Sequence, residues 1–121
     1  MAGLPKFERL AVEGRVDVLQ PDLSRCGGLT VGKQIADFAM RRQIDCVPHA
    51  WLTDLLTAAS LHLNAYLFNS QYLEFNVSSA SLLRQICRPA IELNHGEIAV
   101  PEAPGLGVEV DEDIVNRYRV L

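Results

Sequence analysis

The feature that most constrains this chain is a repeat of short β-rich segments, each followed by a polar turn and a helical pattern. Segments 16–20, 44–47 and 72–75 are rich in Val, Ile, Leu, Tyr and Phe, and they begin about 28 residues apart. Strands that alternate with helices form parallel sheets with right-handed crossovers. The interval is also close to one-eighth of a (β/α)₈ barrel of roughly 220 residues. The sequence therefore predicts an α/β fold with parallel strands.

Two helices are expected between these strands. Thr30 is a good N-cap for a helix that runs to about Gln43, and Thr53 or Asp54 can cap a second helix that ends near Tyr66. Each helix carries an apolar face at 3.6-residue spacing. The apolar positions are Val31, Ile35, Phe38 and Ala39 in the first, and Leu55, Leu56, Ala59, Leu63 and Tyr66 in the second. These faces would cover the sheet.

The C-terminal part of the chain has a different pattern. Residues 90–93 and 97–100 flank Asn94-His95-Gly96, a turn sequence that favours a β-hairpin. A loop rich in Pro and Gly follows, and Asp111 can cap a last helix that ends near Tyr118. We therefore divide the chain into residues 1–89, a partial barrel with its last three strands, and residues 90–121, a returning segment of hairpin, loop and short helix.

Two architectures accommodate three βα units: a doubly wound receiver domain and part of a larger barrel. A receiver needs an acidic cluster after an early strand and a lysine after a late one. This chain begins with a helix-like stretch over residues 6–13, and its only lysines are Lys6 and Lys33. The sequence therefore favours the C-terminal part of a TIM-type barrel.

Composition narrows the functional class. The formal net charge is −4, which offers no basic surface for nucleic acid. No apolar run approaches the roughly 20 residues that span a bilayer, and the first residues lack a signal-peptide pattern. Three cysteines without C-x-x-C spacing favour reduced, buried thiols over a disulfide framework or a zinc site. We expect a cytoplasmic globular protein.

Three polar residues follow the three expected strands. Asp22 comes after the first strand, His49 after the second, and Glu74 near the end of the third. Reactive groups of parallel βα folds stand at such strand ends, so the three side chains are expected to be neighbours on one rim. An Asp beside a His fixes the imidazole tautomer and stabilises its protonated form. Glu74 lies among apolar residues, which favours a protonated carboxyl that can donate to a developing oxyanion.

Each of these residues also has a simpler structural explanation. Asp22 can cap the following turn, His49 can be a solvated loop residue, and Glu74 can be an ordinary edge residue. Spacing alone leaves these alternatives open. Other polar residues are weaker candidates. His62 lies in a helix and His95 in the hairpin turn, where packing or surface roles are more common, and Gly27-Gly28 lacks the context of a phosphate loop. Trp51 suits either a pocket or packing.

Four segments together resemble a known family. They are Val16-Asp17-Val18-Leu19-Gln20-Pro21-Asp22 with Cys26-Gly27-Gly28-Leu29-Thr30, Val47-Pro48-His49-Ala50-Trp51, Tyr72-Leu73-Glu74-Phe75, and Gly96-Glu97-Ile98-Ala99-Val100-Pro101 with Pro104-Gly105-Leu106-Gly107-Val108. In this order they resemble the sixth, seventh and eighth barrel strands and the returning segment of the mandelate racemase group of the enolase superfamily. The resemblance covers nearly the whole chain.

The resemblance implies a mechanism. Family members bind a small carboxylate substrate on Mg²⁺ and remove the proton next to the carboxylate. By position, His49 would be the base, Asp22 its partner, and Glu74 a hydrogen-bonding group for a substrate carboxylate oxygen. An acid-sugar dehydratase is the first expectation, with a racemase or epimerase as the alternative. A noncatalytic α/β interaction domain that retains these residues is an alternative of another class.

The resemblance also implies groups that do not map to this chain. The family takes its three metal-binding carboxylates from strands three to five and a second-face lysine from strand two, and a separate domain caps the site. We therefore expect the isolated chain to bind no Mg²⁺ and to show no turnover. A partial barrel exposes strand edges, so we also expect a homo-oligomer.

Overall fold

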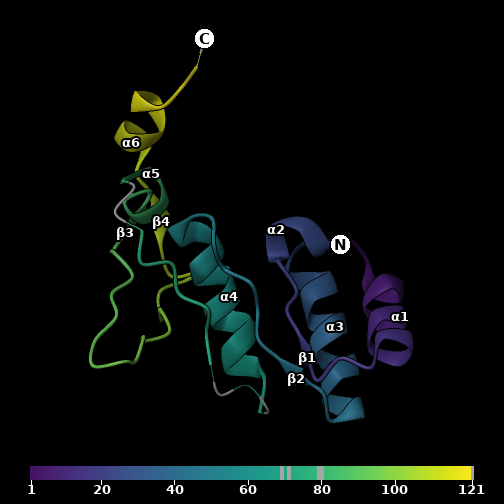
Figure 1. Cartoon of the computed structure of the whole chain (residues 1–121). Helices are drawn as coiled ribbons and strands as arrows, with labels where there is room; N and C mark the ends of the chain where they lie inside the picture. Colours follow the sequence, from purple (N-terminus) through teal and green to yellow (C-terminus); the bar gives the residue numbers. More distant parts are fainter. Residues whose placement is uncertain (69, 71, 79–80, 121) are drawn as a thin grey trace.

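The computed structural model describes residues 1–68, 70, 72–78 and 81–120. In order, its elements are α1 (Leu4–Gly14), β1 (Val18–Leu19), α2 (Leu23–Cys26), α3 (Gly28–Arg42), β2 (Asp45–Cys46), α4 (Asp54–Tyr66), α5 (Ser81–Arg84), β3 (Cys87–Arg88), β4 (Glu109–Val110) and α6 (Glu112–Arg117). Figure 1 shows α1 to α3 with β1 and β2 on one side of α4, and α5, α6, β3 and β4 on the other.

A βαβ unit forms the first group. β1 and β2 pair in parallel, with Val18 opposite Asp45 and Leu19 opposite Cys46, and α3 is the crossover between them. Backbone hydrogen bonds continue the pairing beyond both strands, from the Val47 N–H to the Leu19 carbonyl at 3.0 Å. The predicted α/β fold, parallel strands and crossover helix are confirmed over this part of the chain.

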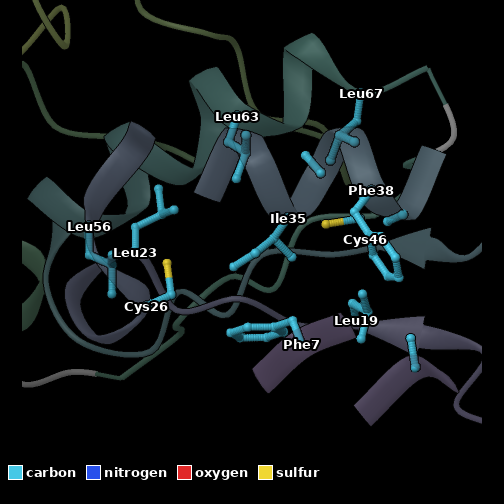
Figure 2. Packing of buried hydrophobic residues seen from close by; sticks show 13 residues of the cluster. Phe7, Leu19, Leu23, Cys26, Ile35, Phe38, Cys46, Leu56, Leu63 and Leu67 are labelled. Atoms are coloured by element: carbon cyan, nitrogen blue, oxygen red, sulfur yellow. The ribbon is translucent and has the colours of Figure 1, made fainter. Parts of the chain in front are cut away.

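The larger hydrophobic core lies where α1, α3 and α4 pack around β1 and β2. Figure 2 shows thirteen buried residues of this cluster, with Leu19, Ile35 and Cys46 fully buried at its centre. Gly32 allows the helices to approach each other, because an added Cβ would lie 2.3 Å from Leu23 Cδ2 and 3.3 Å from Leu63 Cδ2. The strands whose ends carry the candidate site therefore lie in a tightly packed core.

The predicted helix starts are correct for α4 and wrong for α3. Thr53 is the N-cap of α4, and its hydroxyl accepts from the Leu56 N–H. α3 begins at Gly28 rather than after Thr30, because Gly27 adopts a φ of 124° that joins it directly to the short helix α2. A Cβ at Gly27 would lie 2.8 Å from Val31 Cγ2, so the junction requires glycine. Gly27 is therefore the single turn residue between α2 and α3.

The predicted third strand is wrong. Residues 72–78 form no strand with any described part of the chain. A strand requires a backbone partner along its edge. Here side chains replace that ladder: the Glu74 carboxylate accepts from the Ala50 N–H, and the Asn76 amide donates to the Trp51 carbonyl. Periodicity reveals an apolar run but cannot show that its backbone lacks a partner.

The C-terminal group differs in part from its prediction. Asn94 and Glu97 exchange backbone hydrogen bonds of 2.8 and 2.9 Å around His95 and Gly96, both at positive φ, so the two-residue turn is confirmed. The expected flanking strands are absent from the described residues, which pair there only at this one position. The antiparallel pair β3–β4 was not predicted, since its partners are 21 residues or more apart.

Two further features agree with expectation. Asp111 caps α6, accepting from the Asp113 and Ile114 N–H groups at 3.1 Å. Cys26, Cys46 and Cys87 are buried free thiols, and burial raises the pKa of Cys46 to about 12.

No helix in the described part of the chain is long and apolar enough to cross a membrane. The division at residue 89 stays a prediction.

Candidate active site

The candidate site lies at the carboxyl ends of β1 and β2. Beyond the strands, Asp22 and His49 are partners in a further parallel pairing, with the His49 N–H donating to the Pro21 carbonyl at 3.1 Å. Prolines before both residues end the regular ladder, since Pro has no N–H to donate. The backbone of the βαβ unit therefore sets Asp22 and His49 side by side.

Asp22 has two roles at once. Its Oδ1 accepts from the Ser24 N–H at 2.9 Å and the Ser24 hydroxyl at 2.5 Å, which caps α2. Its Oδ2 lies 3.1 Å from His49 Nδ1 and 3.5 Å from Arg25 Nε. Burial raises the pKa of this carboxyl, but the hydrogen bonds from Ser24 and His49 outweigh burial and hold the pKa below its usual value. Asp22 is thus a fixed anion beside the imidazole.

His49 lies between the two acids. Nδ1 faces Asp22, so its proton is held there and Nε2 is the free ring atom. Nε2 lies 3.8 Å from Glu74 Oε2. The His49 side chain is 39% exposed, against 11% for Asp22, so a small molecule can reach the ring while its orienting partner is shielded. This is the geometry required of a general acid/base.

Glu74 reaches the rim from a different part of the chain. Its Oε2 accepts from the Ala50 N–H at 3.2 Å, directly after His49. Two residues further on, the buried Asn76 donates to the Trp51 carbonyl at 3.5 Å. The structure thus brings together all three predicted site residues, although Glu74 arrives on an irregular segment and not on a strand.

The weaker candidates lie elsewhere. His62 contacts the Leu106 carbonyl through Nε2 at 3.1 Å, a packing contact between α4 and the C-terminal loop. His95 is exposed in the turn, and Trp51 is half exposed beside His49. Sequence reasoning missed Ser24 and the Ala50 N–H as partners of the acids. Ser two residues after Asp is a recognisable Asx-turn spacing, whereas nothing in the sequence marks Ala50.

The described residues do not fit a metal site. A Mg²⁺ ion requires octahedral oxygen ligands, supplied by carboxylates and water. In the described ranges, no group of three or more His, Cys, Asp or Glu lies close enough to hold an ion. Asp22 and Glu74 are engaged with Ser24, His49 and Ala50. The chemistry that these two carboxylates can supply is therefore hydrogen bonding and support of proton transfer, and not ligation of an ion.

Comparison with solved structures agrees with this architecture. A member of the enolase superfamily from Polaromonas sp. JS666 matches 99% of the chain with a TM-score of 0.90 and 37% identity. The 3,6-anhydro-D-galactonate cycloisomerase from Zobellia galactanivorans matches 97% of the chain with a TM-score of 0.85 and 37% identity. The chain covers 32% and 33% of those two proteins. The βαβ unit of β1, α3 and β2 is thus a portion of the barrel of such proteins.

Sequence comparison gives the same family. The D-galactonate dehydratase of Ralstonia pickettii (strain 12J) is 36% identical over 115 residues, which are 90% of this chain and 30% of that protein. The chain therefore spans about a third of the length of its relatives. A family model described as "Enolase C-terminal domain-like" matches residues 1–114. The chain belongs to the enolase superfamily, to the family of its C-terminal domains.

Proposed function

We propose that this chain supplies the acid/base rim of an enolase-superfamily enzyme that removes the proton next to a substrate carboxylate. The observation that carries the proposal is the alignment of Asp22 Oδ2, His49 and Glu74 Oε2, with 3.1 Å to Nδ1 and 3.8 Å to Nε2. Both ring nitrogens of His49 then have a role. Nδ1 is oriented by Asp22, and Nε2 faces the place where substrate would lie.

In this proposal His49 Nε2 takes the proton from the carbon next to the carboxylate. The electron pair of that C–H bond moves to the carboxylate, giving an enolate. Asp22 stabilises the imidazolium that forms, and Glu74, in its protonated form, donates a hydrogen bond to a carboxylate oxygen as charge develops. In a dehydration the enolate then expels the neighbouring hydroxyl. His49 returns its proton to that group, which leaves as water.

The whole enzyme is expected to depend on Mg²⁺, as enolase-superfamily enzymes generally do. Since the described residues provide no cation site, the ion would be held by carboxylates in another part of that enzyme. We expect the isolated chain to bind no Mg²⁺ and to turn over no substrate. A cytoplasmic location is part of the same proposal.

An acid sugar is the substrate class that we propose. The support is the name of the Ralstonia pickettii relative, a D-galactonate dehydratase, together with that of the Zobellia cycloisomerase, which also refers to a galactonate. A racemase or epimerase remains the alternative, since it requires the same proton removal and differs only in the fate of the enolate.

A chimera tests the proposal. The matching last third of the Ralstonia pickettii dehydratase would be replaced by residues 1–121 of this chain, and dehydration of D-galactonate and α-proton exchange in D₂O would be measured. We expect activity in the chimera and its loss by about 10³-fold or more in His49→Ala, because the base would be removed.

His95→Asn is the matched control, since His95 lies in an exposed turn at positive φ, a conformation that Asn tolerates. This variant should keep full activity. A His49→Ala chimera that is folded and as active as the parent chimera would overturn the proposed role. Proton exchange without dehydration would favour the racemase or epimerase.

Self-association is also proposed, because β1 has an open strand edge. Val18 on β1 is 44% exposed, and β2 is the only described strand that pairs with β1. Unpaired edges favour association between copies. We expect a dimer or larger species by light scattering, and a monomer at high concentration would contradict this.

A further inference from the structure

The segment that carries Glu74 poses a positioning problem. Residues 72–78 pair with no described strand, yet Glu74 must be held opposite His49 and the Ala50 N–H. The hydrogen bonds that link Glu74 and Asn76 to the backbone at Ala50 and Trp51 are 3.2 and 3.5 Å long. Hydrogen bonds of that length are weak restraints on an irregular segment. Its apolar residues Leu73 and Phe75 also pack against a hydrophobic cluster of α4 and Ile91, and a polar group at Phe75 would restrict the segment further.

Arg84 provides three contacts around this segment. Its Nη1 donates to Asp54 Oδ1 at 2.8 Å, and its Nη2 donates to the Ile91 carbonyl at 2.9 Å. Its guanidinium carbon lies 4.3 Å from the centre of the Phe75 ring, the residue after Glu74. A planar guanidinium can donate at its edge and stack on its face at the same time. Arg84 thus joins α4, the Phe75 ring and the chain at Ile91.

Asp54 makes this contact set rigid. It is the first residue of α4, with its side chain 1% exposed, and α4 belongs to both hydrophobic clusters. Burial raises the pKa of Asp54, and Arg84 opposes that rise. A buried ion pair with good geometry admits few alternative arrangements, because losing one partner leaves a buried charge.

We propose that Arg84 is a positioning residue for Glu74. Anchored on Asp54, it holds the Phe75 ring, and with it the adjacent Glu74 opposite Ala50 and His49. This inference rests on the proposed function only in the task given to Glu74. The position of Glu74 itself can be measured without turnover.

The Ala50 amide reports that position in the 121-residue chain, by hydrogen exchange and by its proton chemical shift in NMR spectra. Glu74→Ala defines the signal when the bond is absent. Arg84→Lys keeps the charge beside Asp54, but one ammonium cannot make all three contacts. We expect Ala50 exchange to rise roughly tenfold in Arg84→Lys, with the shift moving towards the Glu74→Ala value. Amides within α4, such as Leu56, should keep their protection.

A double variant addresses loss of folding. Asp54→Asn with Arg84→Met removes both charges, so no buried charge stays unpaired. It should also release the Ala50 amide. Arg88→Lys is the matched control, since Arg88 pairs with Asp111, at 3.0 Å, and not with Asp54. Ala50 should be unchanged there.

The proposal is wrong if Ala50 keeps its parental exchange rate and shift in both Arg84 variants while Glu74→Ala changes them. It is equally wrong if α4 amides lose protection in proportion to Ala50, since Arg84 would then be merely structural. Failure of the proposed function has a different signature, an active His49→Ala chimera, and leaves these NMR results unaffected.

Discussion

The two regions of the chain, residues 1–67 and residues 72–78 with 81–118, differ in the contacts that hold their backbones in place. In the first, a parallel ladder and four helices surround thirteen buried residues of one cluster. The second packs against a cluster with three buried members among the described residues: its own Ile91, and Ala58 and Leu61 from α4. Side-chain contacts such as that between Arg84 and Asp54 provide much of the remaining stabilisation in the second region. α4 is shared by both regions.

The candidate site lies across the boundary between these regions. Asp22 and His49 belong to the first region and are fixed by backbone pairing, whereas Glu74 belongs to the second and is fixed by side chains. The acid/base pair should therefore tolerate changes that displace Glu74. A site built in this way separates the pair that we propose to transfer the proton from the group that we propose to contact the substrate oxygen.

The largest expected effect comes from truncating the centre of each cluster. Ile35→Ala should lower the free energy of unfolding by about 4–5 kcal/mol, near the top of the range for buried Ile, because helices on several sides prevent collapse. Ile91→Ala should cost about 2 kcal/mol, because its partly exposed neighbours can close the gap. Urea denaturation followed by circular dichroism measures both.

Hydrogen exchange in the same two variants sharpens the comparison. Ile35→Ala should weaken amide protection in both regions, since α4 connects them, whereas Ile91→Ala should affect mainly the second. Equal losses of stability, with equal loss of protection throughout, would show that the two clusters unfold as one unit.

A smaller effect is expected at the helix contact in the first region. Gly32→Ala would raise helix propensity by about 1 kcal/mol at an open position. Here the added methyl would lie 2.3 Å from Leu23 Cδ2, so overpacking should dominate and destabilise the chain by about 1–3 kcal/mol. Gly28→Ala is the comparison without overpacking. No neighbouring heavy atom lies within 4 Å of the added Cβ at Gly28, so only its φ of +79° opposes the change. A stabilised Gly32→Ala variant would contradict the close packing of α3 with α2 and α4.

The difference between the regions also explains what could be predicted from the sequence. In the first region, strands, crossover helix and the Thr53 cap follow from local periodicity and capping chemistry, and they were predicted. The start of α3 was not, because the positive φ of Gly27 outweighs the capping preference of Thr30. In the second region the stabilising contacts join distant residues, so Phe75 and Arg84 gave no local signal.

The candidate site divides in the same way. Asp22 and His49 follow strands at equal intervals, so parallel topology alone predicts them as neighbours. Their orientation needed Ser24, which the Asx spacing would have revealed. Glu74 was predicted near the rim on a strand that does not form. Its actual support, the Ala50 N–H and the Arg84 contacts, depends on folds of the chain that no local pattern specifies.

The smallest expected effect is a pH dependence that distinguishes the two regions. The pKa of Asp22 is below 3.8 in the folded chain, so its ionised form stabilises the fold above 3.8, and that contribution is lost as the pH falls through the folded pKa. Asp22→Asn should therefore destabilise the chain at pH 5 and match the parent more closely near pH 2. Water screens this interaction. We therefore expect the difference in the free energy of unfolding between Asp22→Asn and the parent to change by less than about 1 kcal/mol between the two pH values. Urea midpoints at the two pH values measure it.

Asp54 provides the opposite sign at the boundary of the second region. Burial raises its pKa, so the protonated form of Asp54 stabilises the fold. This stabilisation is fully present below pH 3.8 and is lost as the pH rises through the higher pKa of the folded chain. The parent chain should therefore lose stability from Asp22 on acidification while it gains some from Asp54. If the destabilisation caused by Asp22→Asn increased towards pH 2 instead, the Asp22 carboxyl would not be held as an anion. The orientation of His49 would then need another source than its pairing with Asp22.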